Sequence, residues 1–444
     1  MTSLAIQRLF FGPLSLVLAT IVYAGPPYWL PGAQGLAPRT FSPSSVQLDS
    51  IAPHPAKPSW RTLRSEQAAE RWNEEASELI VKYRLNPLRS VRALSYLHVA
   101  MDDAARRTEE LGLKETAQTA AIHMAASNML AHFFPLEPTS RLEAIGESAL
   151  VALMASQPQQ AHEGAIGASV GRDVARLAIM RALNDGADVI WDARTRPAEK
   201  PGMWHGTPPL ETAHPQEPLA GSWQTWVIKS GGEIQPPAPP GANSDVFLRA
   251  AKEVLDVSTH LTPEQKRIAE YWHLDQGTIT PPGLWNLKAR ELAARWRLTE
   301  KERLRLLSLL NVAMLDASIA CWHAKYSWWV QRPATTIQER LDETFMPYLV
   351  TPPHPSYVSG HATVSGAAAE ILKRFFPKAA HQIDEWAEDA AQSRLYGGIH
   401  YRFDNEAGLL LGRQIGKTVL ERAPGGAKSS ASMGFNGHPA ADAL

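Results

Sequence analysis

The sequence predicts an all-α protein of two packed helical bundles joined by a long proline-rich crossover. Residues 60–188 and 244–423 are rich in Ala, Leu, Glu and Arg and contain few helix breakers, which favours long helices. Between them, residues 189–243 are rich in Pro, Gly and Trp and show no helical period. The length of 444 residues and the apolar content of 44% are sufficient for large buried cores.

The N-terminus has the features of an export signal. Arg8 precedes an apolar run over residues 9–23, and a small-x-small pattern ends just before Gly25. We expect residues 1–24 to be a cleaved signal peptide and the protein to be exported, periplasmic or secreted; an uncleaved anchor is the alternative. Elsewhere no stretch approaches about 18 uninterrupted apolar residues, so no membrane span is expected in the mature chain.

Proline and glycine divide the remaining chain into elements. Residues 25–59 are expected to be an irregular segment before the first bundle. Within that bundle, Pro87, residues 134–138 and Pro158 mark helix boundaries, because proline disrupts a helix interior. The tail, residues 424–444, is rich in Gly, Ser and Ala and is expected to be disordered.

The two helical segments resemble diverged copies of each other. The matches are residues 99–104 with 312–317, residues 133–135 with 375–377 (242 positions later), and residues 171–172 with 412–413 (241 positions later). The near-equal offsets favour an internal duplication, although Ala-rich helices can also resemble one another by composition. We expect two bundles side by side, each burying its apolar stripe in its own centre.

Residues suited to binding an oxyanion gather in the second helical segment. They are Lys325, Arg332, Ser359, Gly360, His361, Arg394, His400 and Asp404. Lysine supplies a compact charge, arginine a planar fork for two oxygens, and glycine a close backbone approach. One histidine can bond covalently to the central atom while the other moves protons. These residue types predict a site for a tetrahedral oxyanion. At the repeat offsets, His361 and His400 fall on Thr119 and Gln159, so the first bundle is expected to be a scaffold.

The spacing of these residues resembles the three-part signature of the superfamily that joins type-2 phosphatidic acid phosphatases, bacterial acid phosphatases and vanadium-dependent haloperoxidases. Val358 departs from it, since the signature has proline there. The length and doubled bundle resemble the haloperoxidase branch. In that branch a tryptophan lines the anion pocket, as Trp322 would here, and a carboxylate faces the second motif arginine, as Asp275 would face Arg394. His354 resembles an extra histidine of the bromide-using members. The alternatives are a core tryptophan and a solvent-exposed loop histidine.

The resemblance implies an enzyme that uses vanadate as its cofactor and oxidises halide, bromide or iodide, with hydrogen peroxide. The anion's oxygens would be bound by Lys325, Arg332, Arg394, Ser359 and Gly360. His400 would bond to vanadium, Asp404 or a nearby carbonyl would hold its other ring nitrogen, and His361 would exchange protons.

Two other functions fit the same residues. In an exported acid phosphatase, which needs no cofactor, His400 would attack the phosphorus of a phosphate ester and His361 would protonate the leaving oxygen. A non-catalytic oxyanion-binding protein would not need both histidines. The formal net charge of −1 gives no basic surface for nucleic acid. Cys321, the single cysteine, allows no internal disulfide and is expected to be packed core. An all-helical protein of this kind can form a homodimer through exposed helix faces.

Overall fold

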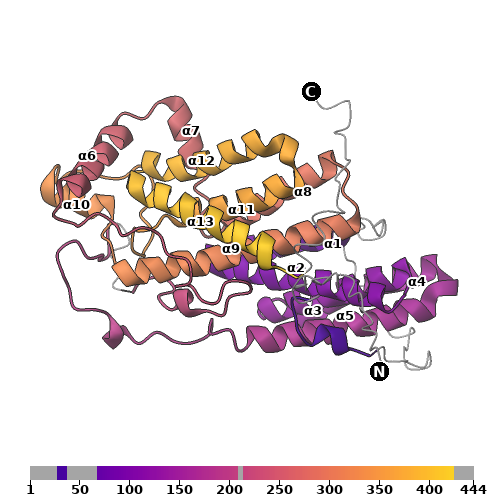
Figure 1. Cartoon of the computed structure of the whole chain (residues 1–444). Coiled ribbons are helices and arrows are strands. Elements are labelled where there is room, and N and C mark those ends of the chain that lie inside the picture. Colours follow the sequence, from indigo (N-terminus) through magenta and orange to yellow (C-terminus); the bar gives the residue numbers. More distant parts are fainter. Residues whose placement is uncertain (1–27, 38–67, 209–213, 425–444) are drawn as a thin grey trace, which may run out of the picture.

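The computed structural model describes residues 28–37, 68–208 and 214–424 (Figure 1). Within these ranges it contains thirteen α-helices, and β-pairing is limited to two isolated bridges. The all-α prediction is therefore confirmed. The predicted signal peptide, most of the irregular segment before the first bundle and the tail after Pro424 lie outside the described residues.

The first half of the chain forms five helices. They are α1 (Ala68–Lys82), α2 (Pro87–Glu110), α3 (Glu115–Phe133), α4 (Thr139–Ser156) and α5 (Ala161–Ala182). Their ends follow local chemistry. Asn86 caps α2 by accepting a hydrogen bond from the backbone N–H of Arg89 at 2.9 Å, and Pro87 is the first helical residue. Pro158 starts the short 3₁₀ turn that separates α4 from α5.

The second half forms eight helices. They are α6 (Asp245–Thr259), α7 (Pro263–Tyr271), α8 (Thr280–Arg295), α9 (Glu300–Trp328), α10 (Pro333–Arg340), α11 (Gly360–Phe375), α12 (Ala380–Tyr396) and α13 (Arg402–Arg422). Thr262 and Thr299 begin α7 and α9 with capping boxes. Between α5 and α6 the described residues contain only two 3₁₀ turns, Ala193–Thr195 and Ala220–Ser222.

Glycines set a close helix crossing in each half. They lie on α5 against α3 and on α13 against α11. On α5, a Cβ added at Gly167 would lie 1.9 Å from the carbonyl oxygen of Ala117, and one at Gly171 would lie 2.2 Å from that of Ala121. On α13, a Cβ added at Gly408 would lie 2.8 Å from the carbonyl oxygen of Ser359, and one at Gly412 would lie 2.0 Å from that of Thr363. Only a residue without a side chain permits such approach. The second crossing brings α13 against the start of α11, which is part of the candidate site.

Helix α9 crosses the centre of the molecule, between the indigo-to-magenta first half and the orange-to-yellow helices of the second (Figure 1). Apart from His323, every residue from Leu304 to Lys325 is buried, because the helix is apolar on all sides. Helix α9 packs against α2, α11 and α13, so buried apolar residues of both halves form one continuous cluster. The apolar centres of the two halves therefore join through α9.

The same helix is the one described helix that is long and apolar enough to cross a membrane. Its most apolar window, however, is wholly buried inside the protein, as in the core helix of a globular domain.

Two buried carboxylates at matching positions of α2 and α9 bind backbone N–H groups of non-helical segments. Asp103 accepts from Trp29 at 3.1 Å and from Leu30 at 2.8 Å. Asp316 accepts from three consecutive amides, those of residues 226–228, at 2.8, 2.8 and 3.1 Å. Burial raises the pKa of Asp316 to about 6, and these hydrogen bonds act in the opposite direction. The two aspartate side chains thereby bind two non-helical segments to the helical core.

Candidate functional site

A cavity of about 70 Å³ brings together residues that are far apart in the sequence. This volume is sufficient for several water molecules, since about 10–15 Å³ holds one. The predicted site residues that border it are Asp275, Trp322, His354, Gly360, His361, Arg394 and His400. Lys325, Arg332 and Ser359 are fully buried and lie outside this lining. A larger cavity of about 340 Å³, between residues 199–205 and α10, contains none of the predicted residues.

Helix α9 and the turn after it position the first two cations. Lys325 lies in the last turn of α9, which ends at Trp328. Trp329 adopts a left-handed conformation, with φ of 53°, which ends the helix and turns the chain towards Arg332. Pro333 then begins α10, where its fixed φ suits the first helical position. Lys325 and Arg332 therefore lie on either side of one sharp turn between α9 and α10.

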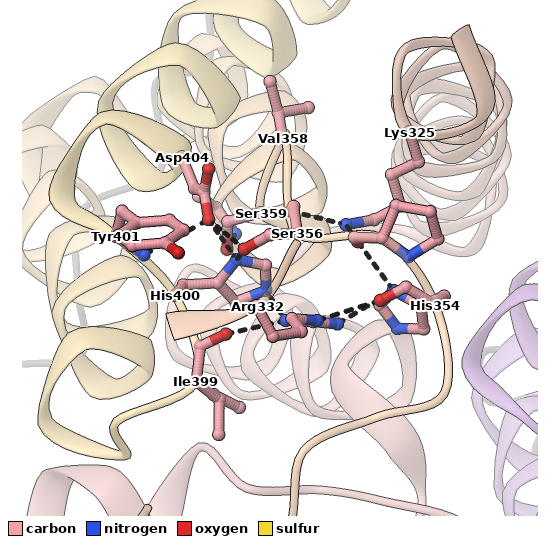
Figure 2. Close-up of polar contacts among 12 residues, drawn as sticks. Lys325, Arg332, His354, Ser356, Val358, Ser359, Ile399, His400, Tyr401 and Asp404 are labelled. Carbon is pink, nitrogen blue, oxygen red and sulfur yellow. Dashed lines mark hydrogen bonds and ion pairs between the residues drawn. The ribbon is translucent and has the colours of Figure 1, made fainter. Parts of the chain in front are cut away.

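Both cations donate to backbone carbonyls (Figure 2). The partners are Pro355 and Ser356 for Lys325 Nζ, at 2.7 and 2.8 Å, and His354 and Ile399 for Arg332, at 2.9 and 2.7 Å. Burial lowers the pKa of Lys325 to about 7 and that of Arg332 to about 10. Among the ion pairs of the described residues, none joins either cation to a carboxylate. Their carbonyl partners are neutral, and the charge of Asp404 acts on both cations from a distance.

His400 is held at both ring nitrogens (Figure 2). Gly398, with φ of 75°, supplies the turn between α12 and α13 that presents the histidine. Nδ1 of His400 lies 2.8 Å from Asp404 Oδ2, and Nε2 lies 3.0 Å from Nη1 of Arg332. A guanidinium can only donate, so Nε2 is the acceptor and the proton is on Nδ1. Burial, followed by the charges of Arg332 and Lys325, lowers the pKa of His400 well below its usual value. The ring is therefore neutral, with the lone pair on Nε2.

One oxygen of Asp404 accepts three hydrogen bonds. Besides His400, Oδ2 accepts from Ser356 Oγ at 2.5 Å and from the backbone N–H of Tyr401 at 3.2 Å. Burial raises the pKa of Asp404 to about 6, so the carboxylate is ionised at neutral pH. The side chain, rather than a nearby carbonyl, is thus the group that holds Nδ1 of His400.

The N-terminus of α11 is directed towards the same place. Ser359 caps it, with Oγ accepting from the backbone N–H of Ala362 at 3.4 Å. A helix start presents unpaired N–H groups and the positive end of the helix dipole, and both attract anions. At Gly360 an added Cβ would lie 3.4 Å from the ring of Trp322, so glycine keeps space between the helix start and that ring.

Arg394, in the last turn of α12, is the third buried cation. Its Nε donates to Ser393 Oγ at 2.9 Å and its Nη2 to the carbonyl of Ala269 at 3.4 Å. Burial lowers the pKa of Arg394 to about 9, and the charge of Asp275 opposes this shift. Asp275 itself is exposed and accepts from the backbone of Gln276 at 2.7 Å. Asp275 therefore acts on Arg394 from a distance, and the ion pairs of the described chain include none between them.

The two remaining histidines also belong to the cavity. Nε2 of His361 is buried and has no hydrogen-bond partner among the described residues. Burial, followed by the charge of Arg394, lowers the pKa of His361 well below its usual value. His354 is 7% exposed, its Nδ1 lies 3.0 Å from Nη2 of Arg332, and its ring centroid is 5.0 Å from that of Trp322. The alternative of a solvent-exposed loop histidine is therefore wrong.

Several cavity residues had no signal in the sequence. Gln216 comes from the segment between α5 and α6, and its carbonyl accepts from Nε1 of Trp322 at 3.2 Å. Leu88 comes from α2 of the first half. His273 lines the cavity near Asp275, and Ser356 lies behind it on Asp404; no spacing in the sequence distinguishes either residue. Cys321 is buried, with a pKa raised by burial, as the packed-core prediction requires.

Sequence comparison identifies proteins similar to the part of the chain that contains this site. Residues 338–384 and 379–425 match the family described as the VCPO second helical-bundle domain. The vanadium chloroperoxidase of Curvularia inaequalis is 28% identical over 159 residues, 30% of this chain and 26% of that protein. The vanadium-dependent bromoperoxidase of Ascophyllum nodosum is 32% identical over 145 residues, 26% of this chain and 25% of that protein. The matched stretches thus span about a quarter of the length of these curated relatives.

Solved structures extend the similarity over most of the chain. The first bacterial vanadium-dependent iodoperoxidase superimposes with a TM-score of 0.68 and 26% identity, covering 80% of this chain and 96% of that one. A holo-type bacterial vanadium-dependent chloroperoxidase gives a TM-score of 0.60 over 81% of this chain and 95% of its own, and at 15% identity it supports the fold alone. With the family domain matched over residues 338–425 and the curated relatives, these similarities relate this chain to the vanadium haloperoxidase family.

Proposed function

We propose that this protein is a vanadate-dependent haloperoxidase that oxidises bromide or iodide with hydrogen peroxide. The observation that carries the proposal is the convergence of three buried cations, Lys325, Arg332 and Arg394, around two neutral histidines. A buried charge without an ion-pair partner is destabilising, and Asp404 and Asp275 offset the three charges only from a distance. A bound oxyanion would offset that cost for all three cations together. The unpartnered Nε2 of His361 supports the same conclusion, because it offers a further polar contact at the cavity.

The donors present fit a tetrahedral oxyanion. Lys325, Arg332 and Arg394 would bind its oxygens, with the first two exchanging neutral carbonyl acceptors for charged ones. The first turn of α11, at Ser359 and Gly360, would add an N–H group and a hydroxyl. Vanadate held there would supply a Lewis acid that polarises peroxide for attack by halide.

The two histidines would divide the remaining tasks. His400 would bond to vanadium through the lone pair of Nε2, because Asp404 keeps the proton on Nδ1. His361, neutral and with Nε2 unpartnered, would accept a proton from hydrogen peroxide at that atom. Neither task requires a charged ring, in agreement with the lowered pKa values of both.

The choice of bromide or iodide rests on similarity and on His354. The bromoperoxidase of Ascophyllum nodosum and the bacterial iodoperoxidase are each more than a quarter identical to this chain over the parts compared. His354 lies on the cavity wall between Arg332 and the ring of Trp322. A polar donor beside the anion would bind a large, weakly hydrated halide at the point where peroxide is activated.

The same geometry also supports phosphate ester hydrolysis. The Nε2 lone pair of His400 could attack phosphorus, and the three cations would stabilise the transferring group. An exported acid phosphatase therefore remains the second candidate, and a non-catalytic oxyanion-binding protein the third. The experiment that separates them measures halogenation of a phenol with bromide and iodide after loading with orthovanadate, and hydrolysis of p-nitrophenyl phosphate without vanadate.

The haloperoxidase predicts peroxide-dependent halogenation that is lost in His400→Ala and retained in His381→Ala. His381 is a matched control because its side chain, on α12, is largely exposed. Hydrolysis without halogenation would identify a phosphatase. Binding of vanadate without either reaction, reduced only in part by His400→Ala, would identify a binding protein.

We also infer that the two halves arose by internal duplication. The glycine contacts support this, since Gly171 and Gly412 occupy matching repeat positions and each meets a carbonyl oxygen of the corresponding neighbouring helix. Asp103 and Asp316 likewise match in the repeat, and each binds backbone amides beginning at a tryptophan. Such similar contacts at residues that match in sequence are unexpected for helices alike only in composition.

A further inference from the structure

Ser356 connects three parts of the site (Figure 2). Its carbonyl accepts from Lys325 Nζ at 2.8 Å, its Oγ donates to Asp404 Oδ2 at 2.5 Å, and its backbone N–H donates to the carbonyl of Val330 at 2.8 Å. Its Oγ also lies 3.4 Å from Nδ1 of His400. The side chain is fully buried, so water does not compete for these bonds.

The hydroxyl of Ser356 helps to fix the orientation of the Asp404 carboxylate beside His400. One oxygen, Oδ2, accepts from Ser356, from His400 and from the Tyr401 amide, whereas Oδ1 is buried without a partner among the described residues. Rotation of the carboxylate out of its present plane would weaken all three bonds. The short bond from Ser356 opposes that rotation, because a charge-assisted hydrogen bond of this length is among the stronger ones in a protein.

We propose that Ser356 is a positioning residue for His400. Through Asp404 it holds the ring of His400 so that Nε2 faces Arg332, and through its carbonyl it binds Lys325 Nζ beside them. This assignment rests on the proposed function, in which Nε2 of His400 binds the central atom of the oxyanion. Ser356 itself does not touch the reacting atoms.

The first test measures vanadate affinity by equilibrium dialysis of the full-length protein. Loss of a partner that orients a metal ligand weakens metal affinity about 10- to 100-fold. Ser356→Ala should therefore bind vanadate about 10- to 100-fold more weakly than the wild type. Ser356→Thr keeps the hydroxyl and should recover most of that affinity. Retention of wild-type affinity by Ser356→Ala would overturn the proposal.

Ser308 provides a matched control. It lies on α9, 17 residues before Lys325, and its Oγ donates to Asp102 Oδ2 at 2.9 Å in an equally buried position. Ser308→Ala removes the same kind of bond from the helical core and should lower stability without changing vanadate affinity. An equal loss of affinity in Ser308→Ala would show that the effect of Ser356→Ala is a general loss of stability.

The second readout does not depend on vanadate. In protein prepared without vanadate and labelled with ¹⁵N-histidine, the nitrogen shifts of His400, assigned with His400→Ala, report its tautomer. The wild type should show a single Nδ1–H form. In Ser356→Ala the Nδ1 shift should move, because the Asp404 carboxylate that accepts from Nδ1 is no longer held by the hydroxyl; an unchanged Nδ1 shift would refute the positioning role. If the wild type binds no vanadate, the proposed function fails while this measurement still decides the role of Ser356. If Ser356→Ala does not fold, Ser356→Cys, whose thiol is a weaker donor of similar size, takes its place.

Discussion

Raising the pH above neutrality should weaken oxyanion binding, because Lys325 then loses its charge. Its pKa, lowered by burial to about 7, means that it is cationic below that pH and neutral above it. A bound anion favours the charged form, so affinity should fall as the pH rises above neutrality. Between about pH 7 and pH 8 the charged fraction falls from about one half to about one tenth, so binding should weaken about fivefold.

The expected change is within what one charge can contribute. At an effective dielectric constant of about 20, two unit charges about 4 Å apart attract by roughly 4 kcal/mol, or close to 1,000-fold in affinity. The other site groups stay nearly constant over this range. Arg394, with a pKa of about 9, keeps most of its charge at pH 8. The carboxyl of Asp404, with a pKa raised to about 6, is already mostly ionised, and the lowered pKa values of His361 and His400 keep both rings neutral.

The assay is calorimetric titration with sulfate, a tetrahedral anion whose own charge is constant between these pH values. Ionic strength must be fixed, since salt screens the attraction. Lys325→Met removes the titrating group while keeping a long side chain, and should bind sulfate more weakly at neutral pH and equally at every pH tested. A wild-type affinity that does not change with pH, or a parallel decline in Lys325→Met, would refute the assignment of this dependence to Lys325.

Three further predictions concern stability and reactivity. Gly412→Ala places a Cβ 2.0 Å from the carbonyl oxygen of Thr363 and should cost about 1–3 kcal/mol in urea unfolding, whereas Gly241→Ala, with nothing within 4 Å, should be close to neutral. Asp316→Asn removes the charge that accepts three backbone N–H groups. It should cost about 1–3 kcal/mol and accelerate hydrogen exchange at residues 226–228. The thiol of Cys321, buried and with a raised pKa, should react with a disulfide reagent only after denaturant unfolds the protein.

Helix positions could be predicted where they depend on near neighbours. Pro87 begins α2, and Pro158 lies between α4 and α5, because proline suits the first helical turn and disrupts the interior. The core could not be predicted in the same way. Helix α9 is apolar on every side, and that pattern does not say that α2 of the other half covers one of those sides.

The chemistry of the site was readable from the sequence, because charge, hydrogen-bonding capacity and the freedom of glycine belong to each residue type. That information was enough to select Lys325, Arg394, His361 and His400 and to place them in a superfamily. Which atoms meet was decided by tertiary packing. In the structure His400 and Ser356 both donate to the carboxylate of Asp404, and His354 is buried against Trp322. Asp275 forms no ion pair with Arg394 among the described residues. These arrangements depend on segments that are distant in the chain, and no local preference encodes their approach.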